Sequence, residues 1–132
     1  MSYETNIDVR FRDIDAMGHV NNAVYASYAE QARVDYFEDV LDRDLSAVSS
    51  VLARIEIDYR RPIELGDGPV TVLVDVPSLG ESSIPMTYEI QNAAGDVAAS
   101  VESVQVAYDR ETESSMLIPE DWREAIASYH DL

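Results

Sequence analysis

The chain of 132 residues has the size of one domain, so a single domain is predicted to span residues 1–132. It contains 26 acidic and nine basic residues, which give a net charge of −17. This charge argues against a nucleic-acid partner, because phosphate backbones are bound by basic surfaces. The absence of cysteine excludes disulfides and thiolate chemistry, and no apolar run approaches the ~20 residues that cross a bilayer.

All nine basic residues are arginine, and 46% of the chain is hydrophobic, so we expect it to fold despite its charge. In molar salt the Debye length falls to about 3 Å, which screens the repulsion between surface carboxylates. We therefore interpret the protein as salt-adapted, or halophilic, with an ordinary acidic protein as the alternative. No basic segment followed by an apolar stretch opens the chain, so a cytoplasmic location is expected.

The first predicted element is a strand over residues 3–11, where apolar and polar side chains alternate. A helical period then predicts one long helix over residues 22–41, with Asn21 or Asn22 as its N-cap. The apolar stripe of this helix is wide enough to cover one face of a sheet.

Alternation resumes after the long helix and predicts four further strands, over residues 53–60, 70–76, 84–90 and 97–108. Pro85 favours an edge position or a bulge, and a change of apolar phase in the last strand predicts a bulge near residues 102–104. A short helix is predicted over residues 119–129. One long helix over an antiparallel sheet is an α+β arrangement.

Residues 13–25 join the first strand to the long helix and carry the strongest functional signal. They read Asp-Ile-Asp-Ala-Met-Gly-His-Val-Asn-Asn-Ala-Val-Tyr. A helix start offers unpaired backbone N–H groups that suit a developing oxyanion. A carboxylate held beside them can act as nucleophile or general base. We expect Asp13 to bond backbone N–H groups of the turn, which leaves Asp15 as the candidate for the chemistry.

The element order and the pattern Asp-x-Asp-x-x-Gly-His-Val-Asn-Asn-x-x-Tyr resemble the hotdog-fold acyl-CoA thioesterases, and the 4-hydroxybenzoyl-CoA thioesterase-like branch matches best. Residues 59–62, Tyr-Arg-Arg-Pro, match a second signature of that family. The resemblance covers roughly residues 3–110. It implies a curled antiparallel sheet of about five strands wrapped around the long helix. It also implies a homodimer with active sites at its interface, and pairing of dimers into a homotetramer.

By position, the resemblance makes Asp15 the catalytic carboxylate that cleaves an acyl-CoA thioester to a free acid and coenzyme A. Backbone N–H groups near Asn22 and Ala23 would hold the thioester oxygen. For His19 two roles stay open from the residues: it orients Asp15 or the thioester, or it is a hydrogen-bonded structural histidine. The reaction needs no cofactor, because coenzyme A is part of the substrate. The remaining predicted substrate contacts around this site are Gly18, Asn21, Ala23, Tyr25 and Tyr59.

Coenzyme A carries phosphate groups, so an acidic protein needs a local basic site for it. Arg54, Arg60 and Arg61 are the densest basic cluster in the sequence, and their planar guanidinium groups suit phosphate. The alternative is that they only pair with neighbouring carboxylates. The turn at Gly80 has Glu81 where relatives carry a basic residue, which leaves Ser82 and Ser83 as hydrogen-bond donors to the substrate.

Other interpretations remain open from the sequence. A non-catalytic acyl-CoA-binding module on the same fold is the main alternative, and a dehydratase is disfavoured because His19 precedes the helix. Glu30 ranks second to Asp15 as a catalytic carboxylate. No metal site is predicted, since His19 lacks partners at ligand spacing. The acyl group, and coenzyme A against an acyl carrier protein, are not decided.

Overall fold

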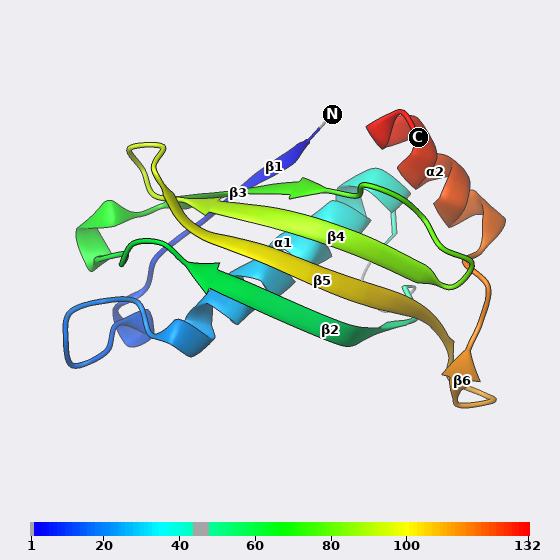
Figure 1. The fold of residues 1–132 in the computed structure, drawn as a ribbon, viewed down its shortest axis with the longest axis horizontal. Coiled ribbons are helices and arrows are strands. Elements are labelled where there is room, and N and C mark those ends of the chain that lie inside the picture. The colour runs from blue at the N-terminus through cyan, green and yellow to red at the C-terminus, as the bar shows by residue number, and fades with distance from the viewer. Residues whose placement is uncertain (1, 44–47) are drawn as a thin grey trace.

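The computed structural model describes residues 2–43 and 48–132, in which one antiparallel sheet curls around a long helix (Figure 1). The helices are α1 (Asn22–Leu41) and α2 (Glu120–His130). The strands are β1 (Tyr3–Ile7), β2 (Ser50–Tyr59), β3 (Val70–Asp75), β4 (Ser83–Gln91), β5 (Val97–Asp109) and β6 (Ser114–Ser115). The strand order is β1-β3-β4-β5-β2, and the short β6 pairs with β5. The predicted α+β class is confirmed.

The core lies between the concave face of the sheet and α1. Every second residue of the three central strands points toward the helix and is buried, as the period of two requires. Val74, Tyr88 and Val101 illustrate the register, since they pair across β3, β4 and β5 on this face. Burial of such a face against a helix is the main source of stability for this kind of layer.

Helix α1 begins and ends where the sequence predicts. Asn21 is the N-cap, and its side-chain oxygen accepts a 2.9 Å hydrogen bond from the N–H of Ala23. Asp42 ends the helix in the left-handed conformation. The buried face is broad and includes a charged residue that the apolar stripe did not reveal, Arg33.

The predicted first strand is too long. Strand β1 ends at Ile7, and the chain turns into a short 3-10 helix at Phe11–Asp13. The Asp13 carboxylate accepts the N–H of Arg10 at 2.9 Å, which bends the backbone and leaves Phe11 83% exposed. An alternating pattern alone could not reveal this side-chain contact to the backbone.

The bulge predicted near residues 102–104 of β5 is confirmed in position, but its extra residue belongs to the neighbouring strand β2. Strand β5 pairs with β4 in unbroken register there, whereas against β2 the register shifts between Leu52 and Arg54, which lie opposite Gln105 and Val104. A further shift against β4 occurs near Ala98. Polar Ser103 and Gln105 keep the inward positions of β5. Pro85 behaves as predicted, because β3 pairs only with residues 87–91 of β4 and leaves Pro85 without a neighbour on that side.

Strand β2 is one edge of the sheet. Its unpaired side carries partly exposed apolar residues, among them Val51 at 41% and Leu52 at 44% exposure. Such a long edge is a natural template for pairing with another strand. Among the residues described, neither helix is long and apolar enough to cross a bilayer.

Candidate active site

The segment before α1 folds back on itself and places Asp15 at the start of the helix. The N–H of Asp15 donates to the carbonyl of His19 at 2.7 Å, and the N–H of Gly18 donates to the carbonyl of Asp15 at 3.0 Å. Gly18 has a φ of +80°, which is why glycine is needed there. The N–H of Val20 then bonds the carbonyl of Ile63 at 2.7 Å, so the loop is fixed to the segment that follows β2.

The Asp15 carboxylate uses one of its two oxygens to organise this loop. Oδ1 accepts the N–H of Met17 at 2.9 Å and the N–H of His19 at 3.2 Å. Within residues 2–43 and 48–132, no donor is bonded to Oδ2. One oxygen is therefore held in place, and the other is left for chemistry.

The backbone N–H groups at the start of α1 are almost all paired. The N–H of Asn21 donates to the carbonyl of Asp13 at 2.8 Å, and that of Val24 to the carbonyl of Asn21 at 2.9 Å. The N–H of Ala23 is taken by the Asn21 side chain. Of the two N–H groups implied by the resemblance, only that of Asn22 has no partner in the described part of the chain.

These groups meet in one surface cavity, which we call the Asp15 cavity. It has a volume of about 250 Å³ and its walls are Asp15, His19, Val20, Asn22, Tyr25, Tyr59, Arg60, Arg61 and Pro62. The structure thus brings together seven of the residues singled out from the sequence, taken from the loop, the start of α1 and the end of β2.

Two tyrosines form one wall of the Asp15 cavity. The rings of Tyr25 and Tyr59 lie edge to face with centroids 5.0 Å apart. The Tyr59 hydroxyl donates to the carbonyl of Asn22 at 2.8 Å. Burial raises the pKa of Tyr25, so this phenol stays protonated at neutral pH. The wall is therefore uncharged and mostly apolar beside the free Asn22 N–H.

The three arginines predicted to bind phosphate have different surroundings. Arg54 forms an ion pair with Glu56 and does not line the Asp15 cavity. Arg60 donates from Nε to the Ser100 hydroxyl at 3.0 Å, and Arg61 pairs with Asp96 at 3.1 Å. The predicted pairing with neighbouring carboxylates thus describes Arg54, while Arg61 pairs with a carboxylate distant in sequence and, like Arg60, lines the cavity.

Other predicted residues lie outside the cavity wall. Gly18, Asn21 and Ala23 shape the loop and the first turn of α1 around it. Ser83 begins β4 and Ser82 directly precedes it, at the end of the sheet opposite the start of α1 (Figure 1). The carbonyl of Ser82 accepts the N–H of Ala107 there. A single chain does not bring these serines to Asp15.

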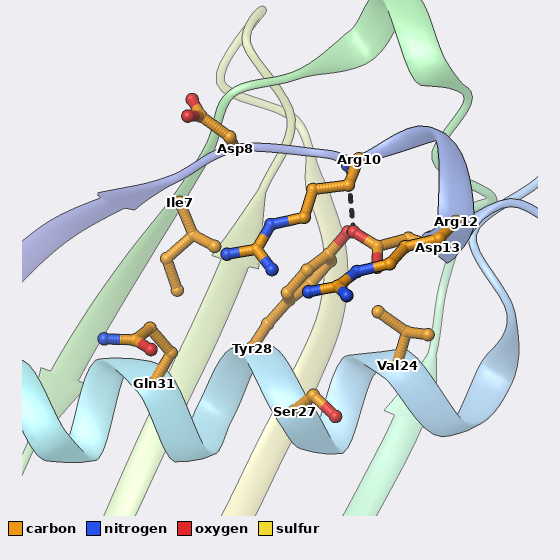
Figure 2. Close-up of a pocket in the computed structure, with 9 residues that line it drawn as sticks. All are labelled: Ile7, Asp8, Arg10, Arg12, Asp13, Val24, Ser27, Tyr28 and Gln31. Atoms are coloured by element: carbon orange, nitrogen blue, oxygen red, sulfur yellow. Dashed lines mark hydrogen bonds between the residues drawn. The ribbon is translucent and has the colours of Figure 1, made fainter.

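A second basic feature was not singled out from the sequence. Arg10 and Arg12 both point into a cavity of about 270 Å³ between the chain after β1 and α1 (Figure 2). In the described ranges neither guanidinium has an ion pair or a hydrogen bond. Asp13 at its wall instead accepts the hydroxyl of Tyr28, and burial together with this bond raises the pKa of Tyr28. The Arg-x-Arg spacing just before the motif is the sequence signal that could have indicated this basic cavity.

Comparison with known proteins gives consistent matches over nearly the whole chain. The model of the "Thioesterase-like superfamily" matches residues 9–126. The long-chain acyl-CoA thioesterase FadM of Escherichia coli is 30% identical over 93% of this chain and 96% of its own length.

Two solved structures are similar throughout. A thioesterase from Thermus thermophilus, solved with coenzyme A and Zn, is 41% identical with a TM-score of 0.87, covering 98% of this chain and 95% of that one. The DHNA-CoA thioesterase of Staphylococcus aureus has a TM-score of 0.87 at 23% identity, covering 99% of this chain and 92% of that one. At that identity the likeness to the latter concerns the fold alone.

Proposed function

Because the chain belongs to the thioesterase-like superfamily, matched over residues 9–126, we propose that it hydrolyses an acyl-CoA thioester in the Asp15 cavity. The enzyme class, thioesterase, follows from this membership and from the 30% identity with FadM. The single observation that carries the mechanism is that Asp15 and the unpaired N–H of Asn22 border the same cavity.

The Asp15 carboxylate supplies the reacting oxygen. In one route Oδ2 attacks the thioester carbon, the C–S bond breaks, and water then hydrolyses the acyl-carboxylate anhydride. In the other route the carboxylate takes a proton from a water molecule, whose oxygen attacks the same carbon. Both routes end with the free acid, and the departing coenzyme A thiolate takes up a proton. The bonds from Met17 and His19 to Oδ1 fix the carboxylate for either route.

The Asn22 N–H stabilises the negative charge that develops on the thioester oxygen. It lies in the first turn of α1, where the helix dipole adds partial positive charge. One such donor typically contributes a factor of ~10²–10³ in rate. His19 lines the same cavity, which supports the proposal that it orients the substrate.

We propose that Arg60 and Arg61 bind the phosphates of coenzyme A at the rim of the Asp15 cavity. Both are exposed, and both have partners that a phosphate can replace. A phosphate group would compete with Asp96 for Arg61, since a guanidinium binds phosphate and carboxylate oxygens with the same bidentate geometry. Arg54 remains a weaker candidate because Glu56 neutralises it and it lies outside the cavity.

We also propose that two copies pair through their β2 edges. Strand β2 ends at Tyr59, in the wall of the Asp15 cavity, so a second copy seated on this edge would border the site. The exposed Val51 and Leu52 would be covered in such a dimer. Association of dimers into tetramers stays a prediction from the resemblance.

The test is release of free thiol from a panel of acyl-CoAs, in high salt, by the wild type and by Asp15→Asn. We expect the variant to lose turnover on the order of 10³-fold while it still binds substrate. Asp8→Asn is the matched control, because Asp8 is exposed in the same segment and should retain wild-type rates. Full activity of Asp15→Asn would overturn the mechanism. Binding without turnover by the wild type would instead favour the non-catalytic acyl-CoA-binding module.

A further inference from the structure

A further cavity, which we call the Arg33 cavity, lies between α1 and the edge strand β2. Its volume is about 210 Å³. The lining residues that matter are Glu30, Arg33 and Phe37 from α1, Ser50 and Leu52 from β2, and Gln105 from β5. None of these residues takes part in the reaction proposed above.

Among the described residues the buried Arg33 guanidinium has no ion-pair partner, and Glu30, which lines the same cavity, is exposed. Arg33 is only 5% exposed, and its Nη1 donates to the Tyr88 hydroxyl at 3.1 Å. No carboxylate pairs with it in residues 2–43 and 48–132, and Tyr88 is its one hydrogen-bond acceptor there. A guanidinium has five N–H donors, and a buried cation without an anionic partner is unfavourable. The cavity beside it is where that partner would fit.

Gln105 presents a second unpaired polar group to the same cavity. It is 6% exposed, and its Oε1 is buried without a hydrogen-bond partner. The nearby hydroxyls do not serve it, because Tyr88 and Ser103 are bonded to each other at 2.7 Å. Buried polar atoms are nearly always paired, so an orphan at a cavity indicates a missing ligand group.

We propose that the Arg33 cavity receives the far end of the acyl group and that this end carries a carboxylate. This inference rests on the proposed thioesterase function. The carboxylate would accept hydrogen bonds from the Arg33 guanidinium, which is the strongest pairing available to it. A half-turn of the Gln105 amide brings its NH₂ to the place of Oε1, where it donates to the second carboxylate oxygen.

The two cavities border the same two elements, which sets the length of the acyl group. Tyr25 of α1 lines the Asp15 cavity and Arg33 lines the second one. Eight residues of helix, a rise of about 12 Å, separate these two side chains, and eleven residues, about 16 Å, separate Arg33 from Asn22, whose N–H is assigned to the thioester oxygen. A thioester at Asp15 therefore needs an acyl chain of medium length to place its end beside Arg33. The apolar side chains of Phe37 and Leu52 flank that end, and the carboxylate of the exposed Glu30 lies in the same wall, so the ligand must bind Arg33 in competition with it.

The test compares acyl groups of equal length that end in a carboxylate or in a methyl group. The pairs are adipoyl- with hexanoyl-CoA, suberoyl- with octanoyl-CoA, and sebacoyl- with decanoyl-CoA. We expect kcat/KM to favour the carboxylate-ended member of at least one pair by about 10- to 100-fold, the factor for a hydrogen-bonded charge. Equal or lower kcat/KM for every carboxylate-ended member would overturn the proposal.

Variants link the preference to the cavity. Arg33→Met should reduce the ratio within each pair to about one, or below it, because the anion then meets no cation. Arg110→Met is the matched control, since it removes the same charge from an exposed site and should leave the ratio unchanged. If the ratio survives in Arg33→Met, the proposal is wrong. If the ratio is unaffected but the oligomer dissociates, Arg33 is instead paired by a second copy of the chain.

A third variant covers the case in which Arg33→Met does not fold. Gln105→Met removes the orphan oxygen at similar volume, so it should raise the melting temperature of the ligand-free protein and lower the ratio by about tenfold. A lower melting temperature with an unchanged ratio would contradict the proposal.

Equilibrium binding of the same pairs to Asp15→Asn separates this inference from the proposed function. The preference must appear in Kd even where turnover is absent. Loss of turnover in Asp15→Asn without any preference in Kd would leave the thioesterase mechanism standing and the carboxylate pocket refuted. A preference in Kd together with full turnover by Asp15→Asn would support the carboxylate pocket and refute the catalytic role of Asp15.

Discussion

The hydroxyl of Tyr59 donates a 2.8 Å hydrogen bond to the main-chain carbonyl of Asn22, and so fastens the end of strand β2 to the first turn of helix α1. The peptide group that accepts this bond is next to the one whose N–H remains unpaired. The edge strand therefore helps to aim the N–H group that we assign to the thioester oxygen. The position of that donor depends on a residue 37 positions further along the chain.

Tyr59→Phe should separate this role from simple packing. The ring contact with Tyr25 is kept, while the hydrogen bond to Asn22 is lost. We expect kcat/KM to fall roughly tenfold, because a small displacement of a catalytic group is costly. The free energy of unfolding should change by about 1 kcal/mol or less. Tyr108→Phe serves as the control, and equal effects of both substitutions on kcat/KM would contradict the assignment.

The N-cap of α1 gives a stability prediction. Asn21→Ala removes the oxygen that holds the N–H of Ala23, and should lower the free energy of unfolding by about 1 kcal/mol. Asn21→Ser keeps a capping oxygen and should remain close to the wild type. Urea denaturation of both variants measures the difference. Identical losses in the two variants would mean that Asn21 acts through something other than capping.

Gly18 is needed for its backbone conformation and not for space. A Cβ built there meets no atom within 4 Å, but the φ of +80° is unfavourable for residues with a side chain. Gly18→Ala should therefore cost about 1–2 kcal/mol and reduce activity through the Asp15 loop. Gly18→Asn should cost less, since asparagine tolerates this conformation better. Gly66→Ala, where neither clash nor positive φ arises, should be nearly neutral in thermal unfolding.

High pH should destabilise the protein through buried tyrosines. Burial raises the pKa of Tyr3, Tyr28 and Tyr36, and hydrogen bonds to Asp39 and Asp13 add to the effect for the first two. In the unfolded chain tyrosine ionises near pH 10. Because the folded-state pKa values are raised, this stabilisation is fully present below about pH 10 and is lost as the pH rises above it.

The measurement for this prediction is tyrosinate absorbance followed together with circular dichroism. The three buried phenols should ionise only as the protein unfolds. Their ionisation while the dichroism stays native would contradict the argument. Tyr28→Phe should make the loss of stability above about pH 10 shallower, because one phenol with a raised pKa is removed.

The charge of −17 predicts a strong dependence on salt. The melting temperature should rise between about 10 mM and about 1 M KCl, since the Debye length falls from roughly 30 Å to roughly 3 Å. The same comparison with a neutral osmolyte controls for solute exclusion from the surface. A melting temperature that is unchanged by KCl would refute the interpretation of the chain as salt-adapted.

Elements with local signals were predictable from the sequence. The bounds of α1 were found because a clear helical period coincides with a capping residue, Asn21. The strand predicted over residues 3–11 failed because the Asp13 side chain turns the backbone at Arg10. The bulge predicted in β5 has its extra residue in β2, and the apolar phase of β5 changes because the structure places polar Ser103 and Gln105 at inward positions.

The candidate site, like the fold, could be predicted from the sequence only in part. The Asp15 cavity was foreseeable in outline, because Asp15, His19 and Asn22 are close in sequence and the Tyr59 segment carries its own signature. The Asn21 side chain accepts the Ala23 N–H, whereas the Asn22 N–H has no partner among the described residues, and this difference depends on local geometry that the sequence leaves open. The buried pairing of Arg33 with Tyr88 joins residues 55 positions apart, and no short pattern predicts it.

The strand order has a consequence for how the chain acquires its structure during synthesis. Strands β1 and β2 flank α1 in sequence but lie at opposite edges of the sheet, and their partners are β3 and β5 (Figure 1). A nascent chain that has emerged only through β2 has no strand with which either can pair. Assembly is therefore expected to start in the β4–β5 hairpin, and the Asp15 loop can dock only after the second half of the protein has left the ribosome.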